Sequence, residues 1–334
     1  MASTTVVIPF ALPPAELAQE LSRNLQAPAL AALLSRNSVL KRHAGAEDSR
    51  LLSHESWLAS ATGSSLAAAV MRGFGLGPAQ GHWFIVHPVH IQLARSRLVL
   101  ADTRRLQLAE EDARVLFDLA KPFFDELLWG DANTWFMRAD SWQGLDTASP
   151  DAAMGGNLAD WMPTGPTALG FKKLQNEIQM LWHEHPVNEA RQQRGLAPVN
   201  SFWMWGGADG QATRDAGQRL AVAAPSGPAH ADYVSGWLSA LATPGSKAAP
   251  GEAGTIVLPH LIPAGAGNDW GAWLGAMQQL EQEWFAPLLA ALNDGRTSEL
   301  TLILGDRDGW KEIRTTKTSL RKFWRAQNLK NLSQ

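Results

Sequence analysis

The chain alternates between short apolar runs and longer stretches in which apolar residues recur every three or four positions. The β-branched run at residues 4–10 has the composition of a strand that is buried on both faces. Leu17, Leu21 and Leu25 are spaced to line one face of a helix over residues 14–34. Further strands are expected at residues 83–102 (two strands), 133–139, 198–205, 220–224, 255–259 and 300–304.

Helices are expected between these strands, and residues at their ends carry capping signals. Asp269 is placed to cap a helix over residues 270–292, and Gly295 is placed to end it. Pro186 can begin a short helix and Gly195 can stop it. The alternation predicts an α/β fold with a mostly parallel sheet and helices on both faces. Other helices are expected at 53–70 (interrupted at 62–63), 108–121, 171–184 and, as a solvated amphipathic helix, 317–330.

Composition narrows the function classes. The 334 residues are 45% apolar and 18% charged, which is typical of a globular protein with a large core. A net charge of −3 gives no reason to expect nucleic acid or a membrane as a partner. The absence of cysteine excludes disulfides, thiolate nucleophiles and cysteine-ligated zinc. No run reaches the roughly 18 apolar residues of a membrane helix, and the first residues lack a signal peptide's basic region, so a cytoplasmic location is expected.

Tryptophan is unusually frequent, with 15 residues against a single tyrosine. The residues are spread along the whole chain, which favours core packing over an aromatic binding platform.

Histidine motifs give no metal site. His183 and His185 are two positions apart on a helix and point about 200° apart, so they cannot share an ion. His185 precedes Pro186, which fits a packed or capping role. His87 and His90 are expected on opposite faces of a strand. The glycine-rich stretch 73–81 lacks the Lys-Ser/Thr of a P-loop and does not follow a strand.

Residues 174–207 hold the densest set of polar side chains. Arg191 and Arg194 lie on one short helix, which a strand ending in Gly206 and Gly207 follows. A guanidinium matches the planar geometry of phosphate or carboxylate, so this pair could hold an anion. A helix with a solvated basic face explains the same residues, and the sequence alone leaves both interpretations open.

At this stretch the chain resembles a known family. Archaeal-type cofactor-independent phosphoglycerate mutases carry the pattern HPxNxxRxxxGxxPxN, followed by an apolar strand and glycines. Here the pattern reads His185-Pro186-Val187-Asn188, Arg191, Gly195, Pro198 and Asn200, and then SFWMWGG. The strings PVHIQLARSRLVLAD, GDANTWFMRAD and LQNEIQMLWHEHPVNEAR also resemble the RpfE-type regulatory proteins of proteobacteria, over most of the chain.

The resemblance implies an alkaline-phosphatase-like α/β core that is interrupted by an inserted domain. Residues 1–78 and 198–334 would form the core, and residues 79–197 the inserted α+β substrate domain. The linker-like stretch at 73–81 fits this division. In the mutases, Asp and His residues hold two divalent ions, a serine accepts the phosphoryl group, and arginines hold the substrate.

The chain departs from this pattern at the metal positions. Its first strand runs into Pro9 and Phe10 where the mutases have a metal-binding Asp. The sequence Ser53-His54-Glu55 stands near the place of their nucleophilic serine and aspartate. Asp306 matches a family ligand, but Arg307 replaces the histidine beside it and brings its own positive charge.

We therefore expect a degenerate, non-catalytic relative that needs no cofactor and binds a small phosphorylated or carboxylated metabolite in a regulatory role. The candidate binding residues are Arg138, His185, Asn188, Arg191, Arg194 and Asn200.

Two alternatives stay open. An active phosphomutase or phosphatase would hold Mn²⁺ or Zn²⁺ at a relocated site. A protein-interaction module would contact its partner through the Trp-rich strands and the basic stretch near residue 324. The relocated site would draw on His54, Glu55, His260, Asp306 and Asp308.

Overall fold

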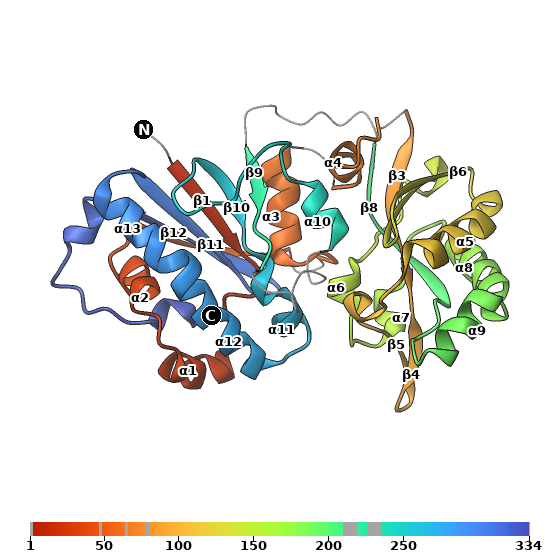
Figure 1. Ribbon diagram of the computed structural model, residues 1–334, viewed down its shortest axis with the longest axis horizontal. Helices are drawn as coiled ribbons and strands as arrows, with labels where there is room; N and C mark the ends of the chain where they lie inside the picture. The colour runs from red at the N-terminus through yellow and green to blue at the C-terminus, as the bar shows by residue number, and fades with distance from the viewer. Residues whose placement is uncertain are drawn as a thin grey trace. The chain divides into compact units, whose positions relative to one another are not determined.

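The computed structural model describes residues 3–46, 49–63, 66–77, 80–209, 219–225 and 235–333 (Figure 1). The chain divides into two compact units, and each unit is built from separate stretches of the sequence. Unit 1 comprises Met1–Trp57, Ala216–Val234 and Leu241–Gln334, and unit 2 comprises Leu58–Asp215 and Ser235–Ala240.

The sheet of unit 1 is mostly parallel, as the alternation of strands and helices predicted. Its strand order is β2-β12-β11-β1-β10-β9. Strands β9, β10, β1 and β11 run parallel, and β12 is antiparallel to both β11 and β2. Val6, Val7 and Ile8 of the central strand are at most 1% exposed. The strands are β1 (Ser3–Ile8), β2 (Val39–Ala44), β9 (Leu220–Val222), β10 (Gly254–Val257), β11 (Glu299–Gly305) and β12 (Gly309–Thr316).

One predicted helix of unit 1 is divided in the structure. The single helix expected over 14–34 is two helices, because Pro28 begins a new one at its first position. The capping roles predicted for Asp269 and Gly295 are confirmed: the Asp269 Oδ1 accepts from the Ala272 N–H at 2.9 Å, and Gly295 has a left-handed φ of 79°. The helices are α1 (Ala15–Asn24), α2 (Pro28–Ser35), α11 (Ile262–Ala266), α12 (Trp270–Leu280), a π turn (Glu281–Phe285) and α13 (Ala286–Asp294). Helix α3 (Ser53–Thr62) has its first five residues in unit 1 and the rest in unit 2.

Unit 2 contains an antiparallel sheet in the order β6-β7-β3-β8, together with a separate hairpin, β4-β5. Figure 1 shows α5, α8 and α9 packed beside this sheet. The strands are β3 (His82–Val89), β4 (Ile91–Ala94), β5 (Arg97–Leu100), β6 (Glu126–Asp131), β7 (Thr134–Arg138) and β8 (Ser201–Asp209). The helices are α4 (Leu66–Gly73), α5 (Glu110–Ala120), α6 (Pro150–Ala153), α7 (Leu158–Trp161), α8 (Ala168–His183), α9 (Pro186–Gln193) and α10 (Gly236–Ala240).

Aromatic side chains fill the core of unit 2. Trp135 packs edge-on against Trp182 with ring centroids 6.1 Å apart, and Phe171 packs likewise against Phe202 at 5.6 Å. All four are at most 1% exposed. Core packing, rather than a binding platform, therefore accounts for these tryptophans, and edge-to-face contacts add to the area that they bury. Trp83, Trp203, Trp205 and Trp273 are also less than 2% exposed.

The division differs from the boundaries suggested by the resemblance. Strand β8 was expected to return the chain to the core at residue 198, but it pairs with β3 in the sheet of unit 2. Helix α4 also belongs to unit 2. The apolar composition of β8 predicted burial on both faces correctly, and it carries no information about which sheet the strand joins.

The helix predicted for residues 317–330 is wrong. The stretch is irregular, with short 3-10 turns at Ser319–Arg321 and Lys330–Leu332. Other 3-10 turns lie at Thr103–Arg105, Lys121–Phe123, Asp140–Trp142 and Pro259–Leu261. Within the described residues, no helix has the length and apolar character to cross a bilayer.

Candidate functional site

Parallel strands β1, β10 and β11 end at the same edge of the unit 1 sheet, and several predicted residues follow them there. Asp306 comes directly after β11, and Phe10 and His260 lie within three residues of the ends of β1 and β10. Open α/β sheets bind their ligands at this edge. The start of α3 also lies here, because the Ser53 hydroxyl donates to the Asp306 carbonyl at 2.5 Å and the rings of His54 and Phe10 are 6.0 Å apart.

The acidic side chains at this edge stabilise backbone turns. The Asp306 Oδ1 accepts from the N–H groups of Asp308 and Gly309, at 2.8 and 2.5 Å. The Glu55 Oε2 accepts from the Leu52 N–H at 2.8 Å, which fixes the first turn of α3. His54 and His260 are buried, with 2% and 8% of their surface exposed. The structure thus brings four of the five candidate metal or catalytic residues to this edge, and Asp308 follows in the exposed turn.

The donors that the described residues offer at this edge do not fit a two-metal centre. Two ions need a compact group of oxygen and imidazole ligands. In the described part of the chain, no three His, Asp or Glu side chains are grouped so that they could hold a metal ion. Phe10 presents an aromatic ring at the end of β1, and its carbonyl accepts from the Trp273 indole at 2.7 Å.

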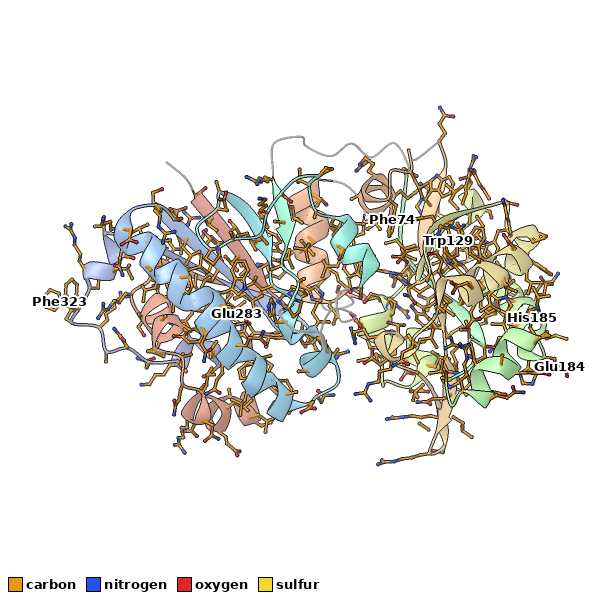
Figure 2. The ribbon with its side chains drawn as sticks, in the orientation of Figure 1. Phe74, Trp129, Glu184, His185, Glu283 and Phe323 are labelled. Carbon is orange, nitrogen blue, oxygen red and sulfur yellow. The ribbon has the colours of Figure 1, made fainter. Side chains whose placement is uncertain are left out.

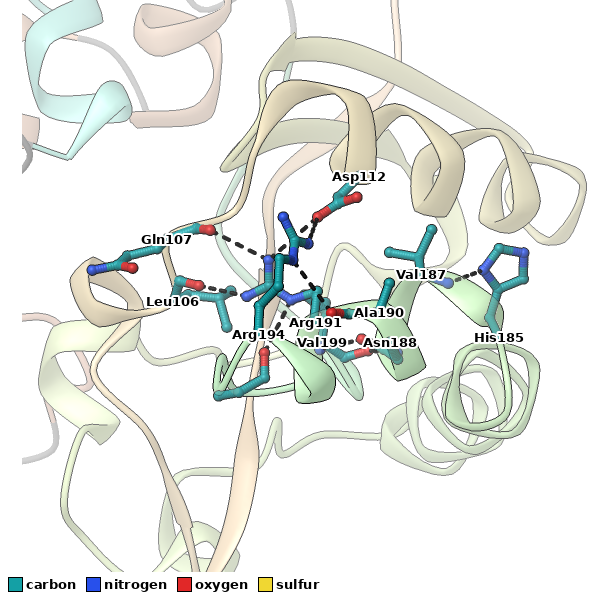
Figure 3. Close-up of polar contacts among 11 residues, drawn as sticks. Leu106, Gln107, Asp112, His185, Val187, Asn188, Ala190, Arg191, Arg194 and Val199 are labelled. Carbon is teal, nitrogen blue, oxygen red and sulfur yellow. Dashed lines mark hydrogen bonds and ion pairs between the residues drawn. The ribbon is translucent and has the colours of Figure 1, made fainter.

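The polar residues of the segment 185–200 bind the backbone of unit 2 (Figure 3). The His185 Nδ1 accepts from the Val187 N–H at 3.3 Å and caps α9, which is one of the two roles predicted for it. The Asn188 amide donates to the Trp182 and Val199 carbonyls and accepts from the Val199 N–H, each at 2.8 Å. The Asn200 side chain pairs in the same way with the backbone of Ile91, also at 2.8 Å.

Arg191 is completely buried, with 0% of its surface exposed. Its guanidinium donates to three backbone carbonyls: to Ala197 at 3.0 Å, to Gln107 at 3.3 Å and to Leu106 at 2.5 Å. Burial lowers the pKa of Arg191, and the Asp112 carboxylate 3.7 Å away opposes that shift. A dissolved anion cannot reach this guanidinium in the folded state, so its contacts are those of a residue that positions the chain.

The other two predicted arginines are accessible, and each is paired with a carboxylate. Arg194 donates to Asp112 at 2.8 Å and has 51% of its side chain exposed. Arg138, at the end of β7, has 36% of its side chain exposed and forms a two-pronged contact with Asp140. The hydrogen bond and charge of Asp140 raise the pKa of Arg138. An anion that binds at either arginine must compete with a carboxylate.

His87, which the sequence placed on one face of a strand, is buried in the sheet of unit 2. The His87 Nδ1 bonds the Asn133 carbonyl at 2.6 Å, and its Nε2 lies 2.9 Å from the Trp205 indole N–H. Because a carbonyl only accepts, Nδ1 carries the proton and Nε2 is the acceptor. Burial lowers the pKa of His87. The sequence placed His87 in an apolar strand, but its partners Asn133 and Trp205 are distant in sequence and could not be predicted from local spacing.

This arrangement predicts a loss of stability in mild acid. The unfolded chain takes up a proton on His87 below pH 6.5, whereas the folded state holds the neutral ring. The contribution of His87 to the stability of unit 2 is therefore fully present above about pH 6.5. It is lost as the pH drops toward the lowered folded-state pKa. The effect is measured by urea unfolding of the wild-type and His87→Phe proteins at pH 7.5 and at pH 5.5. These two pH values, about one unit above and below, bracket the ordinary histidine pKa.

We expect the His87→Phe protein to be less stable at both values but to lose most of the pH dependence. His90, whose pKa burial also lowers, accounts for a smaller residual slope. The exposed His183 provides a control, and His183→Gln keeps the wild-type slope. An unchanged slope in His87→Phe contradicts the prediction.

Comparison with known proteins points to phosphoglycerate mutases. No protein-family model matches the chain. A probable 2,3-bisphosphoglycerate-independent phosphoglycerate mutase of Geobacter sulfurreducens is 26% identical over 151 residues, which are 43% of this chain and 37% of that protein. The corresponding mutase of Methanothrix thermoacetophila is 37% identical over 57 residues, 17% of this chain and 14% of that protein. The matches thus span well under half of the length of either relative.

Structural comparison supports the fold. The PH0037 protein from Pyrococcus horikoshii aligns with a TM-score of 0.52 at 12% identity, over 94% of this chain and 87% of that one. A cofactor-independent phosphoglycerate mutase from Thermoplasma acidophilum aligns with a TM-score of 0.46 at 14% identity, over 99% and 94% of the two chains. The match to the PH0037 protein shows a shared fold, and the predicted α/β class with a mostly parallel sheet is confirmed. The finer resemblance to RpfE-type proteins stays a prediction.

Proposed function

We propose that this chain is a phosphoglycerate-mutase-like protein that does not transfer phosphoryl groups and instead binds a small phosphorylated or carboxylated metabolite in a regulatory role. The observation that carries the proposal is the state of the sheet edge in unit 1. Phe10 replaces a ligand at the end of β1, and the Asp306 carboxylate is bonded to the two N–H groups of its own turn. Phosphoryl transfer in this fold needs metal ions to neutralise the oxyanion, and no divalent metal is expected here.

The metabolite-binding part of the proposal is supported by two accessible arginines. Arg191 cannot contribute, since it is buried and bonded to three carbonyls. Arg138 and Arg194 keep exposed guanidinium groups; Arg194 pairs with Asp112, and Arg138 pairs with Asp140 and, at 3.9 Å, with Glu126. A phosphate ester carries more charge than a single carboxylate and accepts more hydrogen bonds, so it can displace Asp140 or Asp112 from such a site.

The experiment has a catalytic arm and a binding arm. Purified full-length protein with added Mn²⁺ is assayed for interconversion of 2- and 3-phosphoglycerate and for phosphate release, and no turnover is expected. Calorimetry against a panel of three-carbon phosphates and carboxylates is expected to give binding that Arg138→Ala or Arg194→Ala weakens. The fully exposed Arg105, with 87% of its side chain accessible, provides the control Arg105→Ala. Turnover refutes the first half, and silence from every compound refutes the second.

The active-enzyme alternative has one observation in its favour. His54, His260 and Asp306 are buried at the edge where α/β proteins place their ligands. A relocated site would retain Mn²⁺ or Zn²⁺ through purification. Elemental analysis of wild type beside His54→Ala decides the matter, because a bound metal that disappears in the variant would replace our proposal with this one.

A further inference from the structure

The stretch 317–333, here called the basic segment, presents two aromatic rings to solvent. Phe323 is 79% exposed and Trp324 is 70% exposed, and their rings pack edge-to-face at 5.4 Å. Figure 2 shows Phe323 directed away from the ribbon of unit 1. The tryptophans of strands β7 and β8 are buried, so these strands do not offer them as a contact surface. Phe323 and Trp324, in contrast, are accessible to a partner.

The two rings are held in place on both sides. Leu320 and Leu332 are buried, at 7% and 0% exposure, and anchor the segment before and after the pair. The Lys322 ammonium donates to the Asn37 carbonyl at 2.8 Å, and the Arg325 guanidinium donates to the Ser35 carbonyl at 3.3 Å. Both contacts lie at the C-terminal end of α2, where cations are favoured by the helix dipole. The backbone that carries the rings is therefore anchored on both sides, which lowers the entropy lost on binding.

All the charged side chains of the basic segment are positive. It contains five basic residues and no acidic residue, although the whole chain has a net charge of −3. Among the described residues, none of the five forms an ion pair. The residues that follow the rings help to line an open hollow of about 420 Å³, which has no acidic side chain in its lining; they include Arg325, Asn328, Lys330 and Asn331.

From these features we propose that the basic segment is a docking surface for an acidic segment of another protein, with a leucine-like side chain against Phe323 and Trp324 and carboxylates in the hollow. Tryptophan and arginine are the residues most often found at the energetic centre of protein interfaces. A hollow lined with amides and cations, together with a projecting ring pair, offers shape as well as charge, which a flat lipid surface does not use. This surface is independent of the proposed metabolite site in unit 2.

The test uses the full chain and a fluorescein-labelled peptide of glutamates interspersed with leucines. Fluorescence anisotropy should show binding that weakens as salt is raised and that vanishes for a matched peptide with glutamine in place of each glutamate. Trp324→Ala should weaken binding about tenfold. Arg321→Glu with Lys330→Glu should abolish it, and neither side chain holds the segment in place. Met180→Ala, at a site 80% exposed in unit 2, is the matched control and should bind as wild type does.

Three outcomes overturn the proposal. They are failure of the acidic peptide to bind, equal binding by wild type and Trp324→Ala, and binding only to vesicles that contain phosphatidylserine. The last result would assign the segment to an anionic membrane. Circular dichroism of each variant confirms that folding is unchanged.

Discussion

Arg191→Ala is expected to destabilise unit 2 by about 3–5 kcal/mol, the cost of removing one partner from a buried charged network. The substitution leaves the carbonyls of Leu106, Gln107 and Ala197 without their donor, and the Leu106 carbonyl is in the buried part of the site. It also leaves Asp112 without its buried partner. With a urea slope of about 2 kcal/mol per molar, the unfolding midpoint of unit 2 should drop by roughly 2 M.

The measurement must separate the two units, because a chain with two compact units need not unfold in one step. Hydrogen exchange followed by mass spectrometry separates them, because it reports on individual peptides. In Arg191→Ala, faster exchange is expected in peptides from α5 and α9 and not in those from β1. Arg194→Ala is the matched control: it removes an arginine from the same helix end and from the same Asp112, but its side chain is half exposed. We expect that control to cost at most about 1 kcal/mol. Equal effects of the two substitutions would show that Arg191 does not hold the segment.

The same contacts explain why the motif at residues 185–200 predicted a helix correctly but left the role of Arg191 open. The spacing of Pro186 and Gly195 predicted α9 correctly, because helix ends depend on local backbone geometry. The role of Arg191 depends on the loop at residues 106–107, far away in sequence, whose carbonyls it reaches. Sequence spacing carries no information about such long-range partners. A pattern typical of an anion site therefore also describes a buried arginine that ties two segments together.

Some strands could likewise be predicted from the sequence and others could not. The apolar runs that became β1, β8 and β11 were predictable, since burial on both faces requires an unbroken apolar stretch. Strand β2 was missed because it is an edge strand whose side chains are largely exposed, and β12 because Ile313 is the one large apolar residue among its alternating buried positions. The departures from the family pattern at Phe10 and Arg307 could be read from the sequence, whereas the turn-capping role of the Asp306 carboxylate could not.

Glu281→Leu is expected to destabilise unit 1 by about 2–3 kcal/mol. The two carboxylate oxygens of Glu281 accept from the Ala29 and Leu30 N–H groups, at 2.7 and 3.0 Å, and the residue is 7% exposed. Helix α2 begins at Pro28, and Ala27 before it offers no capping side chain. The carboxylate from the π turn therefore caps α2 from a distance in sequence, and its negative charge lies at the positive end of the helix dipole.

Hydrogen exchange of the peptide that covers α2 is the decisive readout. In Glu281→Leu, the amides of Ala29 and Leu30 lose their acceptors while they stay buried, so the whole of α2 should exchange faster. Gln282→Leu makes a similar change one position along the same π turn, at an exposed residue, and should leave α2 as it is in wild type. If both variants exchange alike, the α2 terminus is stabilised by packing and not by the Glu281 carboxylate. A slower rate in Glu281→Leu would have the same meaning, because it requires apolar packing to outweigh two lost charge-assisted hydrogen bonds.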